Sequence, residues 1–142
     1  ELLASIEDPG IDRGYVNYLR GQALRTMEKH DDAIEPLLES AQDDPGNLHI
    51  WLALGWCYKR VRRFDLAIES LEEAESIDSS QAIVHYNLAC YWSLVGKVDH
   101  AVHHLVISFD MDTNYRDLVP QERDFDSIRS DPQFQMVTSV IV

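Results

Sequence analysis

Three histidines and an aspartate in one short stretch suggest metal binding. The stretch contains Asp99, His100, His103 and His104. In an α-helix, His100 and His104 are four positions apart and share one face, where two imidazoles can bind an ion such as zinc. Without a third fixed ligand the two imidazoles bind metal weakly and unselectively. We therefore expect both histidines to face solvent and to titrate between about pH 5 and 7, and no metal or other cofactor is expected.

Four of the twelve basic residues of this acidic chain fall within residues 59–63. They are Lys59, Arg60, Arg62 and Arg63. Ammonium and guanidinium groups at this density can anchor a carboxylate or phosphate of a partner. The simpler interpretation is that they compensate the dipole of the preceding helix and pair with nearby carboxylates. Charge reversal at Arg60 and Arg63 separates the two interpretations, because a partner anchor makes binding salt-dependent.

The sequence contains no recognisable catalytic motif. No nucleophile stands beside a base at a known spacing, and the six glycines form no phosphate-binding loop. Acidic residues such as Glu69, Glu72 and Glu73 have the spacing of a solvated helix face. Cys57 and Cys90 are too few for a disulfide framework, and we expect buried structural thiols in a reducing, cytoplasmic compartment. The chain is predicted not to be an enzyme.

Composition restricts the possible partners. The chain has 142 residues, of which 45% are hydrophobic, and a formal net charge of −13. This charge repels phosphate backbones and anionic lipids, so nucleic acid and membrane surfaces are not expected partners. The longest apolar or small stretch, residues 50–58, is far shorter than the ~20 residues of a membrane-spanning helix. The length fits one domain or one short repeat array.

A repeat of about 34 residues runs through most of the chain. Positions 51, 54, 55 and 58 form one helical stripe, and positions 67, 71 and 74 form a second after a polar break. One period later, Leu54 is matched by Leu88 and Ala67 by Ala101. Small residues recur where two helices must approach closely, and acidic residues such as Asp32 recur where we expect them to cap the second helix. Each unit is predicted to be a helical hairpin.

The motif Trp51-x-x-Leu54-Gly55-x-x-Tyr58, followed by Ala67-x-x-x-Leu71 and Ala74, resembles the tetratricopeptide repeat. The resemblance implies an all-α, right-handed α-solenoid of three helix-turn-helix repeats. The repeats would occupy residues 14–47, 48–81 and 82–115.

Both ends of the chain add expectations. Residues 1–13 resemble the end of a preceding repeat, so we expect a helical lead-in and a chain excised from a longer array. Residues 116–142 are expected to form an irregular helical cap that resembles the closing segment of bacterial arrays. Its last helix should begin at Asp131-Pro132, with the aspartate as N-cap.

The resemblance also implies a protein-protein interaction scaffold, with a concave groove that binds a peptide or helix of a partner. Large rings and arginines are the usual hot spots of such interfaces. Trp56, Tyr18 and Tyr86 would hold apolar groups, and Lys59 and Arg60 an acidic group. The alternative is that the aromatic rings pack between neighbouring helices. The expected groove residues are Tyr15, Tyr18, Gln22, Arg25, His49, Leu52, Trp56, Lys59, Arg60, Ile83, Tyr86 and Asn87.

One well-known partner of the family is not expected. Tetratricopeptide domains that hold the acidic tail of a heat-shock chaperone use a clamp of Lys, Asn and Arg side chains around two carboxylates. The matching positions here hold Tyr18, Gln22, Ala53, Ile83 and Asn87. The partner is therefore an unidentified protein or peptide. Two other functions stay open: self-association into a homo-oligomer, and a regulatory or targeting domain of a larger multidomain protein.

Overall fold

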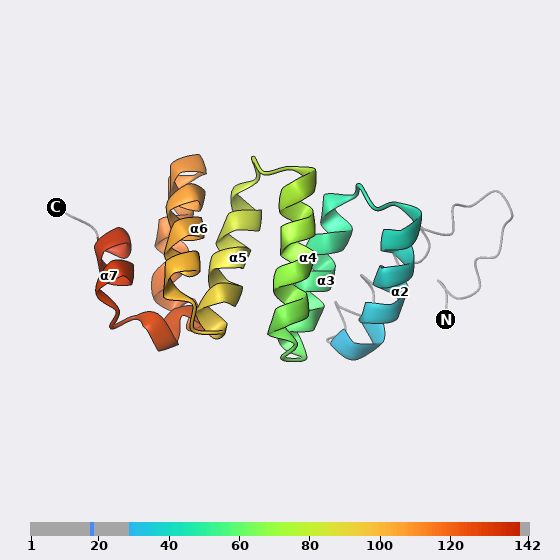
Figure 1. Cartoon of the computed structure of the whole chain (residues 1–142), viewed down its shortest axis with the longest axis horizontal. Coiled ribbons are helices and arrows are strands. Elements are labelled where there is room, and N and C mark those ends of the chain that lie inside the picture. Colours follow the sequence, from blue (N-terminus) through green and yellow to red (C-terminus); the bar gives the residue numbers. More distant parts are fainter. Residues whose placement is uncertain (1–17, 19–28, 140–142) are drawn as a thin grey trace, which may run out of the picture. The chain divides into compact units, whose positions relative to one another are not determined.

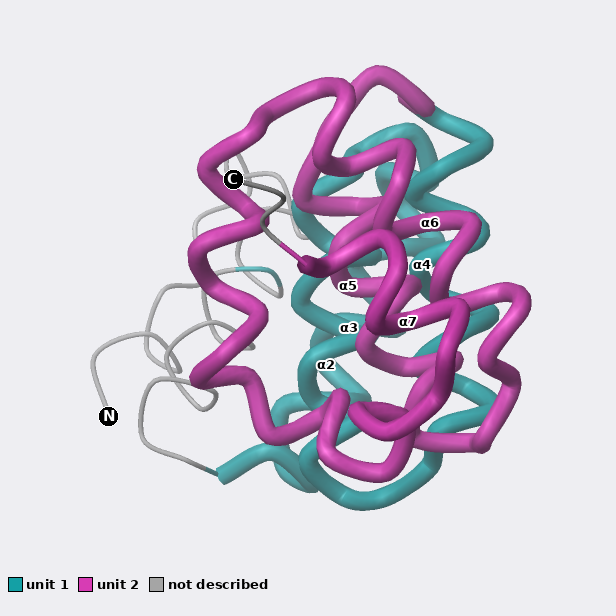
Figure 2. Tube along the Cα trace, turned by 90° about the vertical axis from the view of Figure 1, so that its left-hand side faces the viewer, with its two compact units in different colours: residues 1–77 teal, residues 78–142 magenta. Residues whose placement is uncertain are grey.

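The computed structural model describes residue 18 and residues 29–139, and this part of the chain is helical without strands (Figure 1). It divides into two compact units, Glu1–Ile77 and Asp78–Val142 (Figure 2). None of the described helices has the length and apolar character needed to cross a bilayer. The predicted groove residues Tyr15, Gln22 and Arg25 lie outside the described residues.

Unit 1 contains three described helices, α2 (His30–Asp43), α3 (Leu48–Arg60) and α4 (Phe64–Ile77). Helix α3 packs against both α2 and α4. Ala33 and Ala67 are fully buried, as expected where a larger side chain would force two helices apart. The core between α2 and α3 consists of Ala33, Leu37, Ala41, Ile50, Ala53, Leu54 and Cys57.

The predicted cap of the second helix is wrong. Helix α2 begins at His30 after Lys29, which makes no side-chain capping bond, so Asp32 lies inside the first turn. The helix starts earlier than the acidic residues suggested, and the carboxylates instead oppose the helix dipole from within that turn. Pro36 is also inside α2, and the helix continues through it.

The turns after α3 and α5 (Ala82–Leu94) have the same backbone geometry at matched positions of the repeat. Arg62 has a φ of 65° and Gly96 a φ of 77°, and both are left-handed. Arg63 N donates to Tyr58 O at 2.8 Å, and the backbone after Gly96 repeats this bond from Lys97 N to Trp92 O at 3.0 Å. These bonds close a helix end in the Schellman pattern, which usually places glycine at the left-handed residue.

Unit 2 begins with the hairpin of α5 and α6 (Val98–Met111) and ends with three shorter elements. These are two 3₁₀ helices, η2 (Thr113–Gln121) and η3 (Arg123–Ile128), and α7 (Pro132–Thr138). The Asp131 carboxylate accepts bonds from the backbone N–H groups of Gln133 and Phe134, which confirms the predicted start of the last helix.

The C-terminal segment, defined here as residues 113–139, covers part of the preceding hairpin. Helix η3 packs against α5, and η2 and α7 pack against α6. Phe125 is fully buried between Tyr86 and Phe134, with ring centroids 5.8 and 5.5 Å away. The Ser93 hydroxyl donates to Asp124 O at 2.7 Å, a buried bond that fixes η3 on α5. One face of α5 is therefore covered by the chain itself.

Candidate functional site

One side of α3 carries several of the predicted site residues. Asn47 starts the helix by accepting a bond from His49 N at 3.1 Å. The stripe containing Leu54 turns into the core, and this rotation places Trp56 on the opposite, exposed side. We call this side the α3 face; it consists of His49, Leu52, Trp56, Lys59 and Arg60.

Trp56 is the most prominent side chain of the α3 face. Its exposed fraction is 38%, which is high for a large aromatic residue. Lys59 Nζ lies 5.2 Å and Arg60 Cζ 5.8 Å from the indole centroid, within cation–π range. Arg60 makes no ion pair with any residue that the structure describes. The arrangement presents an apolar ring and positive charge together to solvent.

The other half of the basic run serves the turn. Arg62 Cζ lies 5.3 Å from the Phe64 ring centroid, and Arg63 Nε lies 3.7 Å from Asp65 Oδ1. Both members of that ion pair are well exposed, so the pair adds little stability. The run therefore divides: Arg62 and Arg63 contact the start of α4, whereas Lys59 and Arg60 flank Trp56.

Three other aromatic residues of unit 1 pack against its core cluster. Trp51 is half-buried, and its indole N–H donates to Pro45 O at 2.9 Å, which ties α3 to the preceding turn. Tyr58 is also half-buried, and burial raises the pKa of its phenol. Tyr18 packs against the core cluster of α2 and α3. Its proposed contact with a partner stays a prediction.

On α5, the sequence prediction fails at Tyr86. Ile83 is exposed and Asn87 half-buried, but Tyr86 is only 5% exposed. Its ring contacts those of Tyr115 and Phe125, whose centroids lie 5.1 and 5.8 Å away, and burial strongly raises the pKa of its phenol. The ring cannot hold a partner's apolar group because the C-terminal segment already covers it.

The prediction that His100 and His104 both face solvent is also wrong. His100 is exposed beside Trp92, whereas His104 is buried, with its Nδ1 3.1 Å from the Nδ1 of His85. His85 Nε2 lies 2.8 Å from Ser79 O and must donate to it, because a carbonyl only accepts. Neutral His85 then accepts at Nδ1, and His104 donates. Burial, followed by the nearby His85, lowers the pKa of His104 to about 4.

Both cysteines are buried, as predicted. Cys90 also belongs to a group that the sequence argument missed. Its Sγ and carboxylate oxygens of Glu122 and Asp124 all lie within 4.8 Å of one another. The acidic pair is visible in the sequence, but it falls where the repeat stops, so no periodic position linked it to Cys90.

Comparisons with known proteins agree with the hairpin pattern. A family model described as tetratricopeptide repeat matches residues 48–81, the same residues as the predicted second repeat. No curated protein matches the chain. Among solved structures, MamA of AMB-1 is 25% identical with a TM-score of 0.69, over 72% of this chain and 56% of that one. The chain thus spans little more than half of that protein's length.

Two more distant structures share the fold. YrrB, titled a TPR protein with an unusual peptide-binding site, is 17% identical with a TM-score of 0.72, over 80% of this chain and 59% of that one. The second TPR of Spaghetti (RPAP3), bound to the HSP90 peptide SRMEEVD, is 16% identical with a TM-score of 0.68, over 71% and 94%. These likenesses confirm the predicted all-α class built of helix-turn-helix repeats.

Proposed function

We propose that this chain, whose residues 48–81 form a tetratricopeptide repeat, is a non-enzymatic interaction module that binds a partner's peptide or helix on the α3 face. Trp56 would hold an apolar side chain of the partner, and Lys59 and Arg60 would hold a neighbouring carboxylate. The partner is therefore a protein segment with adjacent apolar and acidic groups.

The observation that carries this proposal is the exposed Trp56 with two cations near its indole. Tryptophan and arginine are the residues most enriched in binding hot spots, because they bury a large area or make directed bonds on binding. The cations at 5.2 and 5.8 Å already restrict the indole, so less rotamer freedom is lost when a partner docks.

Structural neighbours support peptide binding as a class of function. The RPAP3 domain is titled as bound to an HSP90 peptide, and YrrB as having a peptide-binding site. The mode used for a chaperone's acidic tail is not proposed here. Ala53 and Ile83 stand at two positions where that clamp needs polar or basic side chains, so the α3 face would select its partner through Trp56.

Selection from a phage-displayed library of random peptides on the full chain tests the proposal. The dissociation constant of each selected peptide is then measured by fluorescence anisotropy. Trp56→Ala should weaken binding by about 2 kcal/mol, roughly 30-fold, without altering the unfolding midpoint. Leu38→Ala is the matched control, because Leu38 is 40% exposed but lies on α2.

Charge reversal separates the two halves of the basic run. Arg60→Glu should weaken the same peptides in low salt and flatten the dependence of affinity on salt concentration, whereas Arg63→Glu should have a smaller effect because Arg63 pairs with Asp65. Failure to select any peptide contradicts the proposal. So do selected peptides whose affinities are unchanged by Trp56→Ala.

Self-association is a second candidate function. It is favoured by apolar side chains exposed in unit 2, of which Met136 is 77% and Leu118 51% exposed. Exposed apolar surface of this kind can become the core of an interface between copies. Light scattering over a range of concentrations tests the idea, since a mass that stays monomeric at the highest concentration contradicts it.

A further inference from the structure

A compact group of side chains of the types that can ligate metal lies in unit 2 where η3 packs on α5. Cys90 comes from α5, Glu122 immediately precedes η3, and Asp124 is in its first turn. Their three ligand atoms lie within 4.8 Å of one another, a separation that one ion can bridge. Cys90 is 3% and Asp124 9% exposed, so the group is largely shielded from water.

Hydrogen bonds hold the Glu122 carboxylate and the backbone of Asp124 in place. Glu122 is the N-cap of η3, and its Oε1 accepts from Asp124 N at 3.2 Å. The Asp124 carbonyl is held in turn by the buried bond from Ser93. A site whose ligands are held before binding loses little conformational entropy when an ion enters.

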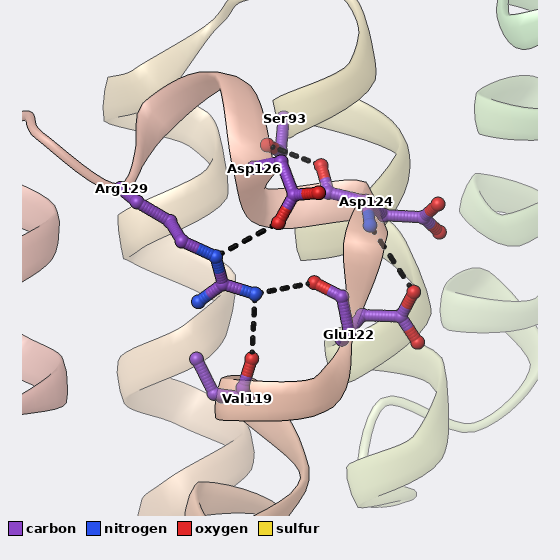
Figure 3. Close-up of polar contacts among 6 residues, drawn as sticks. All are labelled: Ser93, Val119, Glu122, Asp124, Asp126 and Arg129. Carbon is purple, nitrogen blue, oxygen red and sulfur yellow. Dashed lines mark hydrogen bonds and ion pairs between the residues drawn. The ribbon is translucent and has the colours of Figure 1, made fainter.

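The nearby Arg129 is directed elsewhere. Its guanidinium donates to Asp126 Oδ1 at 2.9 Å and to the carbonyl oxygens of Val119 and Glu122 at 3.0 and 2.7 Å. Figure 3 shows the carboxylates of Glu122 and Asp124 extending away from this guanidinium. Arg129 therefore organises the loop, and its guanidinium is not directed at the carboxylates of Glu122 and Asp124.

An unpartnered hydroxyl provides independent support for a ligand. The Tyr86 Oη is buried, and it has no hydrogen-bond partner among the residues that the structure describes. A buried hydroxyl without a partner is costly and calls for an explanation such as an unseen ion or water. Tyr86 lies one helical turn before Cys90 on the same face of α5. Burial, followed by the nearby Cys90, Glu122 and Asp124, raises the pKa of its phenol, and Arg129 opposes this shift.

We propose that Cys90, Glu122 and Asp124 bind a zinc ion, with the hydroxyl of Tyr86 or a water in the fourth position. Zinc accepts thiolate and carboxylate ligands together, whereas magnesium and calcium favour oxygen alone. Binding releases the thiol proton of Cys90 to solvent and forms a zinc–sulfur bond. The ion ties the C-terminal segment to α5, and this role does not depend on the proposed function of the α3 face.

Cobalt titration of the purified, reduced and metal-free full chain tests the site. One equivalent of Co²⁺ should produce a thiolate-to-metal charge-transfer band that added Zn²⁺ removes. Cys90→Ser should abolish the band, and Cys57→Ser, the matched buried thiol of unit 1, should leave it intact. Glu122→Gln should weaken cobalt binding at least ~10-fold. The absence of a band in the unmodified chain, or its survival in Cys90→Ser, overturns the proposal.

Tyr86→Phe keeps the ring and removes only the hydroxyl, which guards against effects of misfolding. The metal-free variant should unfold at the same temperature as the unmodified chain or higher, because a buried unpaired hydroxyl is lost.

Zn²⁺ should raise the unfolding midpoint of the unmodified chain, while Mg²⁺ should not. Stabilisation that is equal for both ions, or that disappears in a His100→Ala, His103→Ala variant, means that the ion binds elsewhere and overturns the proposal.

Discussion

Helices α3 and α5 occupy the same position in successive repeats, yet matched residues on the two helices differ in exposure. Trp56 on α3 is 38% exposed, and Cys90 at the matched position of α5 is 3% exposed. Likewise Lys59 is half-buried with its ammonium near an indole, whereas the matched Ser93 is fully buried under η3. The hairpin is shared, but at these matched positions α3 exposes a large aromatic ring and α5 does not.

The residue types at the matched positions of Lys59 and Ser93 agree with what covers each helix. Ser93 is small and donates to Asp124 O, so η3 can approach α5 closely. A lysine at this position would bury a charge without a matching partner, at a cost of several kcal/mol. The repeat thus supplies a scaffold, and the side chains outside its repeated stripes decide whether a face is covered by the chain itself or stays exposed.

Removing the centre of the cover should have the largest effect. Phe125 is fully buried between Tyr86 and Phe134, so Phe125→Ala should lower the free energy of unfolding of unit 2 by about 3–5 kcal/mol. Urea denaturation measures the loss. Limited proteolysis should show faster cleavage within residues 113–139, which would make the α5 side resemble the open α3 face.

Leu118→Ala is the control for this variant. Leu118 lies in the same segment but is 51% exposed, so its truncation should change stability by no more than about 0.5 kcal/mol. Equal losses for the two variants would contradict the idea that Phe125 holds the cover in place.

Acid should destabilise unit 2 through His104. Its pKa is lowered from 6.5 to about 4 in the folded chain, because burial and His85 disfavour the imidazolium. The free energy of unfolding is therefore highest above pH 6.5, and it falls by about 2–3 kcal/mol as the pH falls toward 4. Urea denaturation at several pH values measures this slope.

His104→Gln should flatten the acid dependence. Its amide can still donate to His85 Nδ1, but it does not titrate. His103→Gln is the matched control, because His103 is exposed. Carboxylates that titrate in the same range affect all three proteins alike, so an unchanged slope in His104→Gln would show that His104 is not the source.

The sequence predicted the parts of the molecule that repeat. Leu54 and Ala67, one from each stripe of the second repeat, are buried as expected, since a helical period determines which side of a helix faces its neighbour. Tyr86 and His104 were misplaced because their burial depends on contacts with residues distant in sequence. Tyr86 is covered by an aperiodic segment, and His104 pairs with a residue of another helix. Periodicity carries no information about either contact.

Trp51 makes a bond that recurs one repeat later with different residue types. Its indole N–H donates to Pro45 O, and one repeat later the ring of His85 makes the same bond to Ser79 O, at 2.9 and 2.8 Å. The bond persists although both residue types change. The side chains at these positions differ, so the sequence does not indicate the bond. The structure shows that both bonds join a ring nitrogen to a backbone carbonyl oxygen.

The two hairpin turns test the comparison between repeats with the smallest expected effects. Gly96→Ala should cost about 1 kcal/mol, because a φ of 77° is unfavourable for any side chain. The added Cβ would meet no atom within 4 Å, so the loss reports backbone conformation alone. Thermal unfolding measures it.

The reciprocal change at the matched turn should be almost neutral. Arg62→Gly relieves a left-handed non-glycine residue with a φ of 65°, but it also gives the unfolded chain more freedom, so stability should change by no more than about 0.5 kcal/mol. A large loss would instead show that the contact of Arg62 with Phe64 stabilises the turn. In that case the basic residue would be kept for local packing, and the charge available to a partner would reside in Lys59 and Arg60 beside Trp56.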